Sequence, residues 1–229
     1  MLRWNHPFRG VLAPVHFIDM LDETGLLRPV TLWLLDEVAI MYRRFSDVGC
    51  SDLQLSINLT ARMLQDDEFS SKLLRHLMDK KSDPHKMIVE LTEDALSEYF
   101  DDANESLQAL RTLGVKVAID DFGTGESSLD HLRSFQFDQV KIDKSYVQDV
   151  NDDAGDASLV KAIIQMGHSF GMQVVAEGVE TVEQLDFLYK NGCDLMQGYL
   201  ISRPVPVDKV DEIIIQHLEK HALPLDIII

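Results

Sequence analysis

Short apolar runs rich in β-branched residues recur along the chain, and each of them ends in an acidic or polar cluster. Five of these runs carry the sequences SINLT, VELTE, VAIDDFGTG, VKID and VVAEGVE. Each is about as long as a buried strand, and a stretch with helical amphipathic spacing follows it. Strands that alternate with helices in this way predict a parallel β-sheet and an α/β fold.

The predicted elements extend through the whole chain. Strands are expected at Leu2–Trp4, Leu53–Leu59, Met87–Leu91, Val115–Asp120, Gln139–Ile142, Gln173–Ala176 and Leu195–Tyr199. The clearest helices are expected at Val30–Phe45, Phe69–Lys80, Asp102–Leu113, Ala157–Phe170, Val182–Asn191 and Pro206–His221. Gly114, Gly171 and Gly192 each follow a helical run, a position typical of the left-handed residue that ends a helix. Thr181 stands before an acidic first turn and predicts a helix N-cap.

The repeating strand and helix unit favours a (β/α) barrel over an open sheet. The Gly-x-Gly-x-x-Gly pattern of dinucleotide-binding folds is absent from the sequence. No Gly/Ser linker divides the chain, so a single domain is expected. A closed TIM barrel needs eight strands, and the pattern predicts seven, the first of which starts at Leu2. A barrel that lacks its first strand is therefore expected.

Composition and charge indicate which kinds of molecule this protein could bind. The 229 residues are 45% hydrophobic, enough for one domain with a large core. The formal net charge of −18 would repel the backbone of DNA or RNA, so no nucleic-acid polymer is expected as a partner. A small anionic ligand fits only where metal ions neutralise the site locally. Without a signal sequence or an apolar run of about 18 residues, we expect no membrane insertion and a cytoplasmic location.

Polar side chains stand at the carboxyl ends of the predicted strands, where the active sites of parallel α/β folds gather. They are Asn58, Glu90, Asp120, Asp121, Asp143 and Glu177, with Lys141 among them. Oxygen ligands without a Cys/His cluster favour magnesium or manganese ions over zinc. The set therefore predicts a metal site at the mouth of the barrel.

Asp120 and Asp121 are the sharpest local feature of this set. Adjacent carboxylates repel one another unless a cation lies between them, and a pair of divalent ions about 3.5–4 Å apart is the usual solution. A simple cap or turn is the alternative for two aspartates at a strand end. The following segment Phe122–Leu129 (FGTGESSL) is predicted to be a lid or a support for the metal site.

Lys141 and Asp143 alternate around Ile142, so both are predicted to face the barrel interior. A lysine there needs acidic neighbours or a substrate phosphate. A structural Lys–Asp ion pair is one interpretation. Among so many carboxylates, the preferred one is that Lys141 holds or activates the attacking water.

Motifs along nearly the whole chain resemble those of one enzyme family. In order, they are LRW (Leu2–Trp4), P-x-x-F-I (Pro14–Ile18), ETG (Glu23–Gly25), NLT (Asn58–Thr60), ELTE (Glu90–Glu93), DDFGTG-x-SSL (Asp120–Leu129), KID (Lys141–Asp143), AEGVET (Ala176–Thr181) and QGY-x-x-SRP (Gln197–Pro204). Together they resemble the EAL-domain family of cyclic di-GMP phosphodiesterases. An unrelated two-metal barrel hydrolase is a minor alternative.

This resemblance implies a modified TIM (β/α)8 barrel with one antiparallel strand, and hydrolysis of cyclic di-GMP to linear pGpG with two Mg²⁺ or Mn²⁺ ions. The implied metal ligands are Asn58, Glu90, Asp120, Asp121 and Glu177, with Asp120 bridging the ions. The implied catalytic residues are Lys141, Asp143 and Glu93, and Arg3, Gln197 and Asp143 are implied in substrate binding. Glu93 matches the glutamate that steadies the loop after Asp121, a loop that the family associates with dimerisation.

The chain departs from the family pattern at its start. The first strand of the barrel and the start of the EAL strand, with its signature glutamate, are missing, because the chain opens with Met1 where the family has the leucine of the motif. Residues 1–229 are therefore expected to form a single, N-terminally truncated EAL domain, with an upstream sensory or cyclase domain as an open alternative. Glu126 also replaces the usual loop residue and is expected to weaken dimer contacts.

Two functions follow from these observations. The first is a metal-dependent cyclic di-GMP phosphodiesterase, supported by the downstream catalytic positions. The second is a degenerate EAL domain that acts as a catalytically weak or inactive cyclic di-GMP receptor or partner-binding module, supported by the missing glutamate. Activity far below that of a complete domain is expected for this chain.

Overall fold

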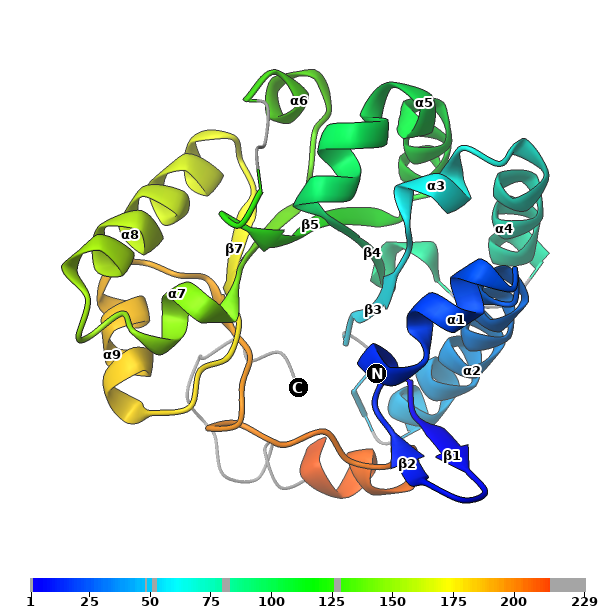
Figure 1. The fold of residues 1–229 in the computed structure, drawn as a ribbon, viewed down its shortest axis with the longest axis horizontal. Coiled ribbons are helices and arrows are strands. Elements are labelled where there is room, and N and C mark those ends of the chain that lie inside the picture. The colour runs from blue at the N-terminus through cyan, green and yellow to red at the C-terminus, as the bar shows by residue number, and fades with distance from the viewer. Residues whose placement is uncertain (1, 48, 51–52, 80–82, 126–128, 215–229) are drawn as a thin grey trace.

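In the part of the chain that the structure describes, six parallel strands form a curved sheet with helices along its outer side (Figure 1). The computed structural model describes residues 2–47, 49–50, 53–79, 83–125 and 129–214. The strands are β3 (Leu55–Asn58), β4 (Met87–Thr92), β5 (Lys116–Phe122), β6 (Gln139–Ile142), β7 (Gln173–Ala176) and β8 (Leu195–Met196). They pair in chain order, which confirms the predicted α/β fold with a sheet that curls like part of a barrel.

Helices α1 (Ile18–Glu23) and α2 (Leu27–Asp47) precede the first of these strands, the other helices connect the strands, and most of them lie along the outer side of the sheet (Figure 1). The connecting helices are α3 (Ala61–Leu64), α4 (Asp67–Asp79), α5 (Glu93–Thr112), α6 (Leu129–Ser134), α7 (Lys144–Gln148), α8 (Ala154–Ser169) and α9 (Val182–Lys190). Short 3-10 turns lie at Pro14–His16, Pro84–Lys86 and Val207–Lys209. Within the described residues, no helix is both long and apolar enough to cross a membrane.

The core lies between the sheet and these helices. All residues of β6 and five of the six in β4 are buried, as expected for parallel strands covered on both faces. Helix α5 contributes Leu107, which is fully buried, and α8 packs closely on β6 and β7 through Gly167. A Cβ atom at Gly167 would lie 2.6 Å from Val174 Cγ2, so this glycine allows the helix and the sheet to approach.

The predicted helix ends are confirmed. Gly114, Gly171 and Gly192 all have positive φ angles, at 96°, 75° and 79°. The Thr181 hydroxyl accepts a hydrogen bond from Gln184 N, and the Gln184 side chain accepts one from Thr181 N. This reciprocal capping box starts α9 directly after the loop that follows β7.

The first predicted strand, at Leu2–Trp4, is wrong. Strand β1 is Trp4–His6, and it pairs antiparallel with β2 (Gly10–Leu12) in a two-stranded sheet of its own. The reason is a tight turn, in which His6 Nδ1 accepts hydrogen bonds from the next backbone N–H groups, Phe8 N and Arg9 N. Within the described residues, the strands of this hairpin pair antiparallel, whereas the six strands of the large sheet all run parallel.

Helix α5 begins at Glu93, nine residues before the predicted helix Asp102–Leu113, and short elements differ as well. Helices α1, α3, α6 and α7 span four to six residues each, too short for a periodic pattern to reveal. Strand β8 ends at Met196 rather than at Tyr199, because the chain turns there toward the loop after β7, where Leu200 N donates to Val179 O. Of the helix predicted at Pro206–His221, residues 210–214 are helical and 215–221 lie outside the described residues.

The substitution Leu107→Ala should lower the free energy of unfolding by about 2–5 kcal/mol, because it leaves a cavity where α5 packs on the sheet. Urea denaturation followed by circular dichroism measures this change. Met78→Ala is the matched control, since Met78 is 70% exposed and its loss should change the unfolding free energy by less than about 0.5 kcal/mol. Equal effects of the two substitutions would contradict this account of the core.

Candidate active site

The ammonium group of Lys141 lies among three carboxylates. Its Nζ atom is 3.0 Å from Glu90 Oε1, 2.9 Å from Asp120 Oδ1 and 2.6 Å from Glu177 Oε1. Lys141 is 4% exposed, and Glu90 and Asp120 are also buried. An ammonium group can donate three hydrogen bonds, so each of the three carboxylates can accept one.

The parallel register brings these side chains to one edge of the sheet. Asn58 at the end of β3 pairs with Glu90 of β4, and Asn58 Nδ2 donates to Glu90 Oε2 at 3.3 Å. Thr92 at the end of β4 pairs with Asp120 of β5. Glu177 directly follows β7, where its backbone N–H donates to Ile142 O and continues the ladder past the strand. The carboxyl ends of neighbouring strands therefore supply the acidic groups side by side.

Asp120 and Asp121 lie in an irregularity of β5 rather than at its end. The pairing of β5 with β6 shifts register between Ile119 and Phe122. Asp121 has a φ of 54°, in the left-handed region that residues other than glycine seldom adopt. Successive strand residues normally point to opposite faces, and this bulge allows both carboxylates to face the same site. The predicted strand ended at Asp120, whereas β5 continues through this bulge to Phe122.

Oxygen atoms in this region are close enough to share a cation. One carboxylate oxygen each from Asp120, Asp121 and Glu177 lies within 4.8 Å of the others. Glu90 and Asn58 extend the set, because Glu90 shares Lys141 with Asp120 and Glu177, and Asn58 contacts Glu90. These donors are carboxylate and amide oxygens, which suit Mg²⁺ or Mn²⁺.

The electrostatics of the cluster show an excess of negative charge. Burial lowers the pKa of Lys141, but Glu90, Glu177 and Asp120 outweigh it, so the pKa lies above its usual value and the lysine stays charged. Burial raises the pKa of Glu177. Burial, followed by the nearby charges of Asp120 and Asp143, raises the pKa of Asp121 to about 6. One lysine does not balance these carboxylates, and bound divalent cations would offset the remaining negative charge.

Asp143 lies beside Asp121 and caps the next helix. Its charge contributes to the raised pKa of Asp121, and its carboxylate accepts hydrogen bonds from the backbone N–H of Ser145 at 2.9 Å and from the Ser145 hydroxyl. Burial raises the pKa of Asp143, but the bonds from Ser145 outweigh that effect and lower it. Asp143 therefore remains a charged neighbour of the cluster while it starts α7.

Glu93 contacts the loop that follows Asp121. This residue is 2% exposed, and its Oε2 atom accepts hydrogen bonds from Gly123 N at 2.7 Å and Gly125 N at 3.1 Å. A Cβ atom at Gly125 would lie 2.2 Å from Asp94 Oδ1, so the loop passes close to the start of α5. Residues 126–128, including Glu126, lie outside the described residues.

The remaining predicted residues, Gln197 and Arg3, lie on different parts of the chain. The backbone N–H of Gln197 donates to Ala176 O at 2.8 Å, so Gln197 follows β8 next to the end of β7. Arg3 is exposed before the β1–β2 hairpin, and its Nη1 atom donates to the neighbouring Leu2 O at 2.8 Å. Tyr146 is not among the predicted site residues, and its hydroxyl donates to Gly123 O at 2.5 Å. Its position three residues after Asp143, in the first turn of a helix, could have indicated that it lies near the site.

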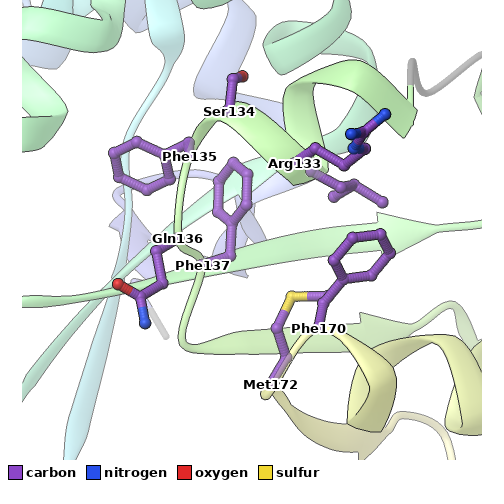
Figure 2. A pocket seen from close by; sticks show the side chains of 8 residues that line it. Arg133, Ser134, Phe135, Gln136, Phe137, Phe170 and Met172 are labelled. Carbon is purple, nitrogen blue, oxygen red and sulfur yellow. The ribbon is translucent and has the colours of Figure 1, made fainter.

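A cavity of about 190 Å³ lies at the opposite edge of the sheet. It is lined by residues 132–137 together with Phe170 and Met172 (Figure 2). These residues precede β6 and β7 in the chain, whereas the acidic cluster follows the strands. The cavity is therefore separate from the candidate active site, and its aromatic lining belongs largely to the core.

Comparison with known proteins supports a single family. The family model described as "EAL domain" matches residues 1–204. The bifunctional diguanylate cyclase/cyclic di-GMP phosphodiesterase MucR of Pseudomonas aeruginosa is 36% identical over 214 residues, which cover 92% of this chain and 31% of MucR. The cyclic di-GMP phosphodiesterase PdeR of Escherichia coli is 36% identical over 206 residues, which cover 90% of this chain and 31% of PdeR. The chain thus spans about a third of the length of these relatives.

Solved structures give the same result. The P. aeruginosa MucR phosphodiesterase in complex with c-di-GMP superposes with a TM-score of 0.87 at 34% identity, and the match covers 92% of this chain and 85% of that one. A manganese and cyclic di-GMP complex of Klebsiella pneumoniae BlrP1 has a TM-score of 0.65 at 34% identity, covering 74% of this chain and 44% of that one. The motifs, the curled parallel sheet and these matches agree, and the chain belongs to the EAL domain family.

Proposed function

We propose that this chain is a phosphodiesterase that hydrolyses cyclic di-GMP to linear pGpG. The observation that carries the proposal is the cluster of buried carboxylates around Lys141 at the carboxyl edge of the sheet. Relatives of the same family are named as cyclic di-GMP phosphodiesterases. A similar structure is described as a complex with c-di-GMP.

The proposed cofactors are two Mg²⁺ or Mn²⁺ ions. The proposed ligands are Asn58, Glu90, Asp120, Asp121 and Glu177, with Asp120 shared between the ions. The close approach of the oxygens of Asp120, Asp121 and Glu177 supports this set, and so does the manganese in the BlrP1 complex. When bound, such ions lower the pKa of water and screen the charge that develops on the phosphate. They would also offset the repulsion between this acidic site and an anionic ligand.

Lys141 is proposed to orient the water that attacks the phosphate. In this structure, the three N–H groups of the ammonium can all donate hydrogen bonds to Glu90, Asp120 and Glu177. If these carboxylates held metal ions, the ammonium group of Lys141 would be free to donate a hydrogen bond to that water. Asp143, beside Asp121, would complete the inner site, and Glu93 would act by holding the loop after Asp121.

The remaining proposals concern the surroundings of the site. Arg3 and Gln197 are proposed to contact the ligand together with Asp143. Homodimerisation through the loop after Asp121 remains a proposal, as does a cytoplasmic location. The relatives are about three times longer than the matched segment, which supports a sensory or cyclase domain upstream in the full protein.

The purified chain should convert cyclic di-GMP to pGpG in Mg²⁺ or Mn²⁺, at a rate far below that of a complete EAL domain, and EDTA should abolish the reaction. Asp120→Asn should lower the rate by about 100-fold or more, because it removes the ligand proposed to join the ions. Chromatographic separation of product from substrate measures the rate. Asp186→Asn removes the same charge from the exposed side of α9 and should leave the rate unchanged. Tight binding of cyclic di-GMP without turnover under either metal would instead favour a receptor.

Lys141→Met should destabilise the metal-free protein by about 3–5 kcal/mol, because the buried carboxylates lose the ammonium group that pairs with them. Added Mn²⁺ should restore part of this stability by replacing the lost positive charge. Urea denaturation in EDTA and in Mn²⁺ measures both effects. A variant as stable as the wild type in EDTA, or one that Mn²⁺ does not stabilise, would argue against this electrostatic description.

A further inference from the structure

Side chains on two sides of β5 hold the peptide groups of Gly123. Glu93, from the start of α5, accepts a hydrogen bond from Gly123 N at 2.7 Å. Tyr146, from α7, donates its hydroxyl hydrogen to Gly123 O at 2.5 Å. The donor and the acceptor of this one residue are thus both bonded to side chains, and these come from the connections after β4 and after β6.

The aromatic ring of Tyr146 also packs against Gly123. This glycine has a φ of 102°, and a Cβ atom added to it would lie 2.9 Å from Tyr146 Cε2. The ring is half-buried and packs against the core. Because the ring is held by packing, the position of its hydroxyl is set before any ligand binds, and the carbonyl of Gly123 is fixed by a rigid donor.

These contacts act two residues beyond Asp121. The left-handed conformation of Asp121 costs free energy and persists only where surrounding contacts hold it. Thr124 bonds back to Asp121 O through its hydroxyl at 2.8 Å, so the segment from 121 to 124 forms one connected turn. Holding Gly123 therefore limits how far the turn can relax, and with it the direction of the Asp121 carboxylate.

We infer that Tyr146 is a positioning residue for the candidate metal site, through its bond to the carbonyl of Gly123. This inference rests on the proposed function, because it assigns Tyr146 a purpose only if Asp120 and Asp121 bind metal ions. Glu93 and Tyr146 hold the same turn from opposite sides. Loss of either bond lets Asp121 leave its left-handed conformation, which moves its carboxylate away from those of Asp120 and Glu177.

Tyr146→Phe tests the inference, since it removes the hydroxyl and keeps the ring. Binding of Mn²⁺ to the ligand-free protein, followed by electron paramagnetic resonance, should weaken by about threefold to tenfold, the effect expected for one lost hydrogen bond. In assays, the Mn²⁺ concentration for half-maximal rate should rise by a similar factor, while KM for cyclic di-GMP at saturating Mn²⁺ stays constant. Tyr189→Phe is the matched control, because Tyr189 is 65% exposed on α9.

Combination with Glu93→Leu, which removes the acceptor oxygens, examines whether the two residues act through one turn. The double variant should lose less Mn²⁺ affinity than the product of the two single losses, because the turn is already released by the first change. If the loss of Mn²⁺ affinity in the double variant equals the product of the two single losses, the two residues do not act through the same turn. Wild-type Mn²⁺ affinity in Tyr146→Phe would overturn the inference itself, even if the variant unfolds more easily. A wild-type protein that binds no Mn²⁺ would instead overturn the proposed function.

Discussion

A single buried ammonium group keeps the carboxyl edge of this sheet together. Lys141 lies within 3.0 Å of Glu90, Asp120 and Glu177, which come from three different strands or strand ends. Removing these charges from water is costly unless they compensate one another. The strands must therefore keep their register, because displacement of any one of them would leave a buried charge without a partner.

The same arrangement leaves the site short of positive charge. Asp121 and Asp143 add carboxylates beside the cluster, and the pKa of Asp121 is raised to about 6 by burial and by its acidic neighbours. Such crowding is unfavourable by itself and becomes favourable when divalent cations are present. Under the proposed function, bound divalent cations would let a protein with a net charge of −18 bind an anionic substrate at this site.

Several parts of the fold and the site follow from local patterns. The apolar run before Glu90 predicted β4, and Thr181 with Gln184 predicted the start of α9. The rule that polar residues at strand ends gather at one edge brought Glu90, Asp120 and Glu177 into one candidate site. The hairpin at the N-terminus could not be predicted in this way, because three-residue strands carry too little periodicity and their pairing depends on the turn at His6.

The sequence by itself determined the α/β class, the acidic character and the oxygen-rich set of candidate ligands, because composition and hydrophobic spacing involve residues close together in the chain. Tertiary structure decided which carboxylates share Lys141, and it placed Asp120 and Asp121 in a bulge rather than at a strand end. It also decided that Tyr146 bonds to Gly123. These contacts depend on strand register and backbone conformation, which arise only when distant segments pack together.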